Sequence, residues 1–212
     1  MAPRCPPGSS IRSSTTRTGR SRMSEPVTAL GGATFAGLVD VTEQGPQGMI
    51  TLRGDLSAAP IRDAAQAAAG TDMPGQRGIA MTGERGIAWM SPDELLILVP
   101  YAQVDGTLAK MQEALQGTHH LAADVSDARA LFALSDGPVR EVLAKLTPAD
   151  LAPGHFGPGE LRRTHLAQAA AALWMPSEGE ARVICFRSVA QYMFDLLSTA
   201  AQPDSAVGLW NA

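Results

Sequence analysis

The sequence lacks most of the signals that mark a catalytic protein. It contains no G-x-G-x-x-G turn, no P-loop lysine motif, no H-E-x-x-H pair and no G-x-S-x-G elbow. Gly157-Pro158-Gly159 has no third glycine after it, and its proline has no amide donor, so we expect a turn there and not a phosphate cradle. These absences exclude the common nucleotide, dinucleotide and hydrolase sites. We therefore predict no catalytic and no cofactor-binding residues in this chain.

Cysteines and long apolar runs are also scarce. Cys5 lies in an arginine-rich stretch, and Cys185 lies in the apolar run 183–186, so we predict no structural disulfide. Cys185 is interpreted as a small buried hydrophobe in a reducing, cytoplasmic protein. No segment reaches the roughly 20 apolar residues of a membrane helix. We therefore expect a soluble protein that does not bind membranes.

Acidic residues are missing from residues 1–22, which carry five arginines and many Ser and Thr. Such a composition predicts a disordered tail. A mitochondrial transit peptide has a similar composition, but prolines and Gly8 interrupt the amphipathic helix that it needs, so we favour Met23 as the native start and leave Met1 open. Without these arginines, twelve of the 17 basic residues remain against 21 acidic ones, a net charge of −9. Such a charge predicts no binding to nucleic acid.

Metal-ligating residues form no convincing cluster. His119 and His120 are adjacent, and adjacent side chains diverge on a strand, so we expect a surface or strand-start role and no metal site. His155 and His165 flank the Pro/Gly-rich turn and are candidate interface residues. Charged residues around the neighbouring strands are expected mainly to form ion pairs or turn hydrogen bonds: Asp124, Asp127, Arg129, Arg162 and Arg163.

Hydrophobic periodicity predicts two successive half-units. In the first we expect a strand at 49–52, a helix at 60–69, a loop at 71–85, two hairpin strands at 86–90 and 95–99, and a helix at 103–116. Irregular sequence precedes them up to Gly48. Asp55 and Ser57 are the expected caps of the first helix, and Gly70 and Gly117 the expected ends of the two helices.

The second half-unit repeats this order. We predict a strand at 130–134, a helix at 139–146, strands at 161–166, 171–175 and 182–186, and a helix at 189–200. Ser188 and Gln191 form the expected capping box of the last helix. The predicted fold is α+β, with two βαββα half-units in a single domain at 23–212 and an additional strand, 161–166, in the second half-unit.

Three ordered motifs carry a family resemblance. They are DVSDARALFALSDGPVREVLAKL at 124–146 with Pro158-Gly159 and Arg163-Thr164 after it, WMSPDELLILVP at 89–100, and RVICFRSVAQYMFDLL at 182–197. Together they resemble the gamma subunit of heterotetrameric sarcosine oxidase. That family is a distant relative of the folate-binding domain of glycine-cleavage T-protein, which is built from a duplicated unit of the predicted kind.

The resemblance implies a non-catalytic subunit that braces an alpha/beta assembly, with a delta subunit as third partner. Such an assembly oxidatively demethylates sarcosine to glycine, with formaldehyde or 5,10-methylenetetrahydrofolate and hydrogen peroxide as further products. FAD, FMN, NAD and tetrahydrofolate would belong to the alpha and beta subunits and zinc to the delta subunit. The alternatives are a stand-alone folate-binding aminomethyltransferase-like or tRNA-modifying protein, and a free-standing binding module.

Two further residues are candidates for contacts with a partner. Arg187 follows a buried strand, where it either contacts another chain or an anion or remains a solvated strand-end charge. Trp210 lies in an apolar C-terminal segment, and such a segment usually docks on its own domain or on a partner.

Overall fold

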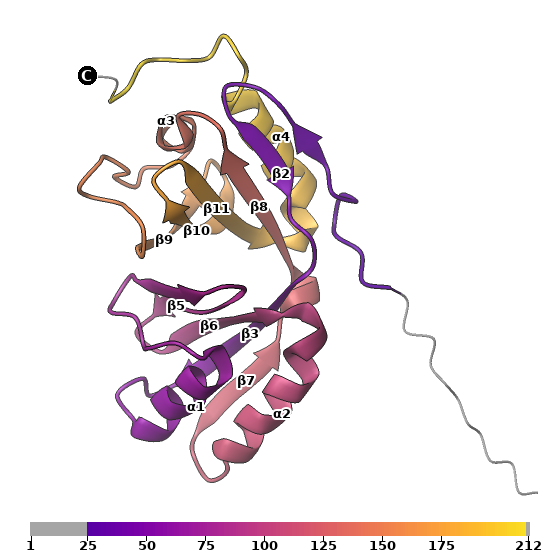
Figure 1. Cartoon of the computed structure of the whole chain (residues 1–212), viewed down its shortest axis with the longest axis vertical. Coiled ribbons are helices and arrows are strands. Elements are labelled where there is room, and N and C mark those ends of the chain that lie inside the picture. The colour runs from indigo at the N-terminus through magenta and orange to yellow at the C-terminus, as the bar shows by residue number, and fades with distance from the viewer. Residues whose placement is uncertain (1–24, 211–212) are drawn as a thin grey trace, which may run out of the picture.

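The computed structural model of the chain describes residues 25–210 and contains two antiparallel sheets with helices on their outer faces (Figure 1). The predicted basic tail 1–22 and Met23 lie outside the described residues. The strands are β1 Thr34–Phe35, β2 Asp40–Glu43, β3 Gln47–Gly54, β4 Ile79–Thr82, β5 Arg85–Ser91, β6 Glu94–Pro100, β7 His120–Asp124, β8 Arg129–Ser135, β9 Leu161–Leu166, β10 Ala169–Ser177 and β11 Glu180–Phe186. The α-helices are α1 Ala59–Ala69, α2 Val104–Ala114, α3 Val139–Ala144 and α4 Ala190–Ala200.

The strands form two sheets of matching order. The first sheet is β4-β5-β6-β3-β7, and the second is β9-β10-β11-β8-β2-β1. Both hairpins that connect the middle strands carry a register shift before their turn, at Trp89/Ser91 and Trp174/Ser177. Two of the matching pairs begin 86 residues apart, β6 and β11 at 94 and 180, and α2 and α4 at 104 and 190. The predicted internal duplication is therefore confirmed.

The duplicated unit is longer than predicted. The expected loop 71–85 contains β4, the counterpart of β9, so both half-units read βαβββα. The segment expected to be irregular up to Gly48 contains β1 and β2. Gly70 ends α1 as predicted, in a left-handed conformation with its amide donating to Gln66 O at 2.7 Å. The expected N-terminal helix caps are wrong. Asp55 accepts hydrogen bonds from Ser57 and does not cap α1, and Gln191 bonds Asp195 in place of a capping box.

Three apolar cores lie between the layers of helices and sheets. The helices α1 and α2 cover the outer face of the first sheet, and α3 and α4 cover that of the second. The two inner faces pack on each other, so that β6 places Leu95, Ile97 and Val99 in the outer core and Leu96 and Leu98 between the sheets. This burial on both faces explains the unbroken apolar run of β6. The result is a four-layer α/β/β/α arrangement, stacked along the long axis of the molecule (Figure 1).

The half-units exchange their outer strands. β2 leads directly into β3 of the first sheet but pairs with β8 of the second, and β7 leads into β8 but pairs with β3. The chain thus crosses between the sheets twice, after β2 and after β7, and a backbone hydrogen bond stabilises each crossing. Gln44 N donates to Leu131 O at 2.8 Å, and Val125 N donates to Met49 O at 2.9 Å. At the opposite edges, Ile79 N donates to Gly159 O at 2.9 Å and a bridge pairs Gly78 with Glu160. Backbone hydrogen bonds therefore connect the sheets along both sides.

A single glycine tests how tightly β2 is packed on the second half-unit. A Cβ at Gly37 would lie 2.1 Å from the carbonyl oxygen of Ala201, which already accepts from Leu38 N at 2.7 Å. We expect Gly37→Ala to lower the free energy of unfolding in urea by about 1–3 kcal/mol, because backbone and not a flexible side chain must move. Gly45→Ala is the control, since nothing lies within 4 Å of its Cβ position. Equal midpoints for both variants would contradict this packing.

Candidate functional site

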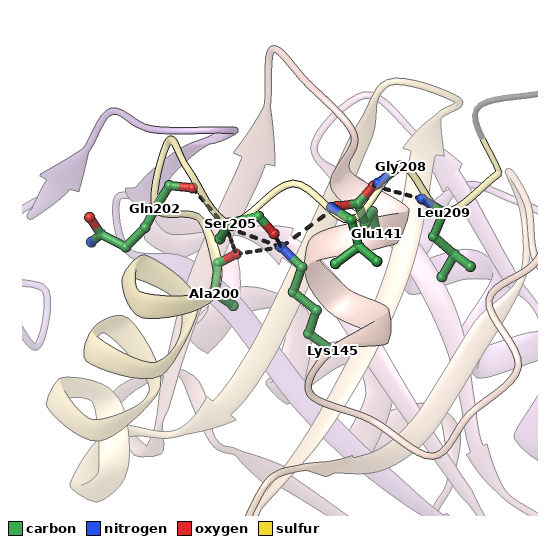
Figure 2. Close-up of polar contacts among 8 residues, drawn as sticks. Glu141, Lys145, Ala200, Gln202, Ser205, Gly208 and Leu209 are labelled. Carbon is green, nitrogen blue, oxygen red and sulfur yellow. Dashed lines mark hydrogen bonds and ion pairs between the residues drawn. The ribbon is translucent and has the colours of Figure 1, made fainter.

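The C-terminal segment is held against α3 by one buried carboxylate. The side chain of Glu141 is 2% exposed and accepts three consecutive backbone amides, from Val207 at 2.6 Å, Gly208 at 3.0 Å and Leu209 at 3.1 Å (Figure 2). Successive N–H groups that converge on one anion stabilise its charge. They lower the pKa of Glu141, Val207 contributing most and Lys145 less, against the opposing effect of burial.

Lys145 ties the same segment to the end of α4. Its Nζ donates to Ala200 O at 3.1 Å and Ser205 O at 2.7 Å, and it lies 3.7 Å from Glu141 Oε1 (Figure 2). A cation at the last carbonyl groups of a helix is favourable because these groups carry partial negative charge. Helix α3, the end of α4 and the C-terminal segment thus form one polar cluster.

The N-terminal segment is held in the same way by a second carboxylate. Glu43 on β2 is 3% exposed and accepts the backbone amides of Leu30 at 3.0 Å and Gly32 at 2.9 Å. Arg187 donates to the carbonyl oxygens of Val27 at 2.9 Å and Thr28 at 3.0 Å. The guanidinium of this candidate interface residue therefore binds the N-terminal segment of its own chain.

The other candidate interface residues lie apart from one another. His155, in the loop between α3 and β9, is exposed and its Nδ1 lies 3.1 Å from Asp150 Oδ2. His165 is exposed on β9. Trp210 ends the described chain and is 37% exposed. The sequence-predicted residues thus do not converge on a single site.

An apolar surface does gather at the C-terminal segment. Val207 is 73% exposed, Leu209 43% and Trp210 37%, directly beside the backbone amides that Glu141 fixes. Fixing these amides orders the segment before any partner arrives, which reduces the entropy cost of binding. We refer to Val207, Leu209 and Trp210 as the C-terminal apolar strip.

The structure offers no arrangement typical of a metal or reactive centre within residues 25–210. No group of three or more His, Cys, Asp or Glu side chains is placed to hold a metal ion there. Cys185 is buried in the outer core of the second sheet, and burial raises the pKa of its thiol to about 11. Among the helices of this region, none combines the length and apolar character that crossing a bilayer requires.

Sequence reasoning missed both glutamates that hold the terminal segments. The only local signal for Glu141 is Lys145 four residues later, a spacing that indicates a helical ion pair and nothing about a distant segment. Glu43 carries no signal, because its partners depend on a turn at 30–32 that has no hydrophobic pattern.

Comparison with known sequences identifies one family. The chain matches the family model described as sarcosine oxidase, gamma subunit family, over residues 53–203. It is 30% identical over 146 residues to the sarcosine oxidase subunit gamma of an Arthrobacter species, covering 66% of this chain and 71% of that protein. It is 32% identical over 113 residues to the subunit gamma of Corynebacterium sp. strain P-1, covering 52% and 55%.

Solved structures agree with the sequence comparison. A chain of the heterotetrameric sarcosine oxidase from Corynebacterium sp. U-96 superposes with a TM-score of 0.73 at 26% identity, covering 82% of this chain and 90% of that chain. The glycine cleavage system aminomethyltransferase T from Bartonella henselae gives a TM-score of 0.53 at 13% identity, covering 73% and 44%. The second likeness concerns the fold alone. It confirms the predicted relation to the T-protein fold.

Removing the carboxylate of Glu141 tests how the C-terminal segment is held. We expect Glu141→Gln to speed hydrogen exchange at the amides of Val207, Gly208 and Leu209, because an amide side chain accepts fewer hydrogen bonds and carries no charge. Glu178→Gln, on the exposed ion pair with Arg140, is the control and leaves these amides unchanged. Unaltered exchange in Glu141→Gln would contradict the assigned role.

The same contact predicts a pH dependence with a definite sign. The pKa of Glu141 is lowered in the folded chain from its ordinary value of 4.5. Such a carboxylate stabilises the fold at any pH above 4.5, and this contribution is lost as the pH falls through the folded-state pKa. We expect the difference in stability between wild type and Glu141→Gln, measured in urea, to persist from neutral pH to about 5 and to shrink in more acidic buffer. A difference that grows on acidification would contradict this sign.

The thiol of Cys185 provides a separate test of burial. In a Cys5→Ser variant, which leaves one cysteine, we expect no reaction with a thiol reagent at pH 8, because the reagent needs an accessible thiolate and the pKa is about 11. One equivalent should react after unfolding in guanidinium. Rapid stoichiometric reaction of the folded variant would show that the core around β11 is open.

Proposed function

This chain belongs to the sarcosine oxidase gamma subunit family, and we propose that it serves a heterotetrameric sarcosine oxidase as a subunit without a catalytic centre of its own. The observation that carries the proposal is the match to a chain of the Corynebacterium enzyme, which covers 90% of that chain with a TM-score of 0.73. The buried polar side chains agree with a structural role, since Glu43 and Glu141 both bind backbone of their own chain.

In this proposal the chemistry belongs to the partner subunits. The assembly demethylates sarcosine to glycine with oxygen as electron acceptor. The alpha and beta subunits hold FAD, FMN, NAD and tetrahydrofolate, and the delta subunit holds zinc. The gamma chain contributes a rigid body that braces the alpha and beta subunits.

The C-terminal apolar strip is the surface that we assign to a partner subunit. Its three side chains are exposed, while its backbone is fixed by Glu141 and, through Ser205, by Lys145. Large apolar side chains on a preordered backbone are well suited to an interface, because little freedom is lost on binding.

Co-expression with the genes of the other subunits tests the proposal. We expect the tagged chain to elute with large flavin-containing chains in gel filtration, and the double variant Leu209→Ala/Trp210→Ala to lose at least about tenfold in recovered complex. Leu121→Ala is the control, since Leu121 is an exposed apolar residue of β7 in the other half-unit. If the wild-type chain elutes without the other subunits, the proposed assembly is contradicted. If the double variant and Leu121→Ala give equal amounts of complex, the assigned surface is contradicted.

Titration with tetrahydrofolate separates this function from that of a folate-dependent transferase. We expect the isolated chain to bind tetrahydrofolate no better than an unrelated protein of the same charge. Tight, saturable binding by the isolated chain would favour the folate-binding alternative.

A further inference from the structure

Two clefts lie between the sheets, and the duplication relates them to each other. The first, about 360 Å³, is lined by Arg129, Arg163, His165, Glu94, Phe186 and a row of alanines. The second, about 610 Å³, contains Gln47, Met81, Glu84, Trp174 and Arg182. We call them the Arg129 cleft and the Gln47 cleft.

The floor of the Arg129 cleft follows from strand register. Ala170 and Ala172 on β10 face the space between the sheets, on the same side of the strand as Trp174 of the inter-sheet core. Their neighbours on β9 are His165 and Arg163, which are paired with Ala170 and Ala172. Small side chains beside long basic ones leave a hollow with an apolar floor and a basic rim.

The opposite rim is formed by an arginine stacked on an aromatic ring. Arg129 on β8 pairs with Phe186 on β11, and its guanidinium carbon lies 4.1 Å from the centre of the Phe186 ring. Within residues 25–210 no hydrogen bond or ion pair occupies its donor groups. Burial lowers the pKa of Arg129, and the positive charge of Arg163 lowers it further, while Glu94 opposes the shift. Arg129 therefore presents a guanidinium whose hydrogen-bonding groups are available to a ligand.

One acidic side chain faces these bases, and it is already shared. Glu94 accepts from Thr51 at 3.0 Å and lies 3.5 Å from Arg163 and 3.9 Å from Arg53. Its single negative charge does not balance two arginines within the cleft. The chain carries a net charge of −4, so a cleft with excess positive charge stands out against the whole molecule.

The duplicated cleft shows that the fold does not require these bases. Arg129 pairs with Phe186. The counterpart of Phe186, 86 residues earlier, is Pro100, and Pro100 pairs with Gln47, so Gln47 is the counterpart of Arg129. Arg163 pairs with Ala172. The counterpart of Ala172, 86 residues earlier, is Gly86, and Gly86 pairs with Met81, so Met81 is the counterpart of Arg163. His165 lies where the β9–β10 hairpin extends beyond the β4–β5 hairpin, which turns after Thr82. The basic groups are thus particular to one copy of the unit.

We propose that the Arg129 cleft binds a small organic carboxylate with a flat apolar body. The guanidinium of Arg129 would hold the carboxylate through paired hydrogen bonds, as planar guanidinium groups do. Arg163 and His165 would add positive charge from β9, and Ala170, Ala172 and the Phe186 ring would contact the apolar body. The volume lies at the lower end of the range for small-molecule sites.

Titration of the full chain with benzoate tests the proposal. We expect saturable shifts of the backbone amide signals of Ala170, Ala172 and Phe186 in nitrogen–proton correlation spectra, with a dissociation constant on the order of millimolar. Benzamide, which has the same shape and no charge, should bind at least about tenfold more weakly. Inorganic phosphate, which has no apolar body, should produce smaller shifts at the same concentration.

Two matched variants locate the site. Arg129→Gln places in the cleft the residue that the duplicated position carries, and we expect it to weaken benzoate binding about tenfold or more. Arg182→Gln removes an arginine of the Gln47 cleft and should leave binding unchanged. Circular dichroism melting confirms that both variants are folded before titration.

Three results of these titrations would overturn the proposal. They are the absence of saturable shifts with wild type, equal affinity for benzoate and benzamide, and equal affinity of wild type and Arg129→Gln. The cleft's chemistry does not depend on the proposed assembly, so binding and co-elution fail or succeed separately. Loss of benzoate binding on addition of the partner subunits would overturn the small-molecule assignment in favour of a protein contact.

Discussion

The exchange of outer strands between the half-units is the constraint on which the rest of the structure depends. β2 completes the second sheet and continues into the first, while β7 completes the first and continues into the second. Hydrogen bonds at both crossings and at the β4 and β9 edges then connect the sheets along two sides. The inner faces bury Met49, Leu96, Leu98, Trp174 and Ile184 between them. Each half-unit therefore lacks a strand and a covered face without the other.

Because the two sheets close on each other, the buried carboxylates of the chain lie outside the inter-sheet core, beside the terminal segments. The terminal segments lie on the second half-unit, where Glu43 and Glu141 bind their backbone amides. A buried carboxylate is costly unless it is fully hydrogen-bonded, and here the donors come from chain that would otherwise be loose. Because each buried glutamate needs these hydrogen bonds, it also fixes the backbone of the segment that donates them. Fixed segments at both ends of the described residues suit the proposed role of a subunit that acts by contact.

The duplication also gives the chain an internal comparison. Both copies keep the same strands and the same hairpin irregularity, but their clefts differ in charge. Features common to both copies serve the fold, as the apolar inner faces do. Features confined to one copy, such as the rim formed by Arg129 and Arg163, are free to serve binding.

Sequence patterns predicted the elements that carry strong local signals. β9 has the predicted bounds 161–166, and the hairpin strands β5 and β6 lie where their apolar runs placed them, because burial on both faces leaves an unmistakable pattern. β4 was missed because Gly and Pro dominate the sequence around its four residues, and β1 and β2 because short strands have too few residues to show a period.

Contacts between distant segments were beyond any local pattern. Glu141 and Val207 are 66 residues apart, and the three bases of the Arg129 cleft meet only through the register of β8 and β9 against their neighbours. The family, in contrast, was recoverable from sequence, because ordered motifs retain information that individual side chains do not. Neither role considered for Arg187, a contact with another chain or an anion or a solvated strand-end charge, anticipated its carbonyl partners at Val27 and Thr28.

Equilibrium unfolding followed separately in each half-unit tests the strand exchange most directly. Trp89 packs on the outer core of the first sheet, and Trp174 lies in the inter-sheet core on β10. Variants that lack Trp210 and retain one of these two tryptophans therefore report on different half-units. We propose that the half-units unfold as one body, which predicts urea transitions with the same midpoint and slope at both tryptophans. Two separated transitions would contradict the account, because they would mean that one half-unit stays folded after the other has lost its exchanged strand.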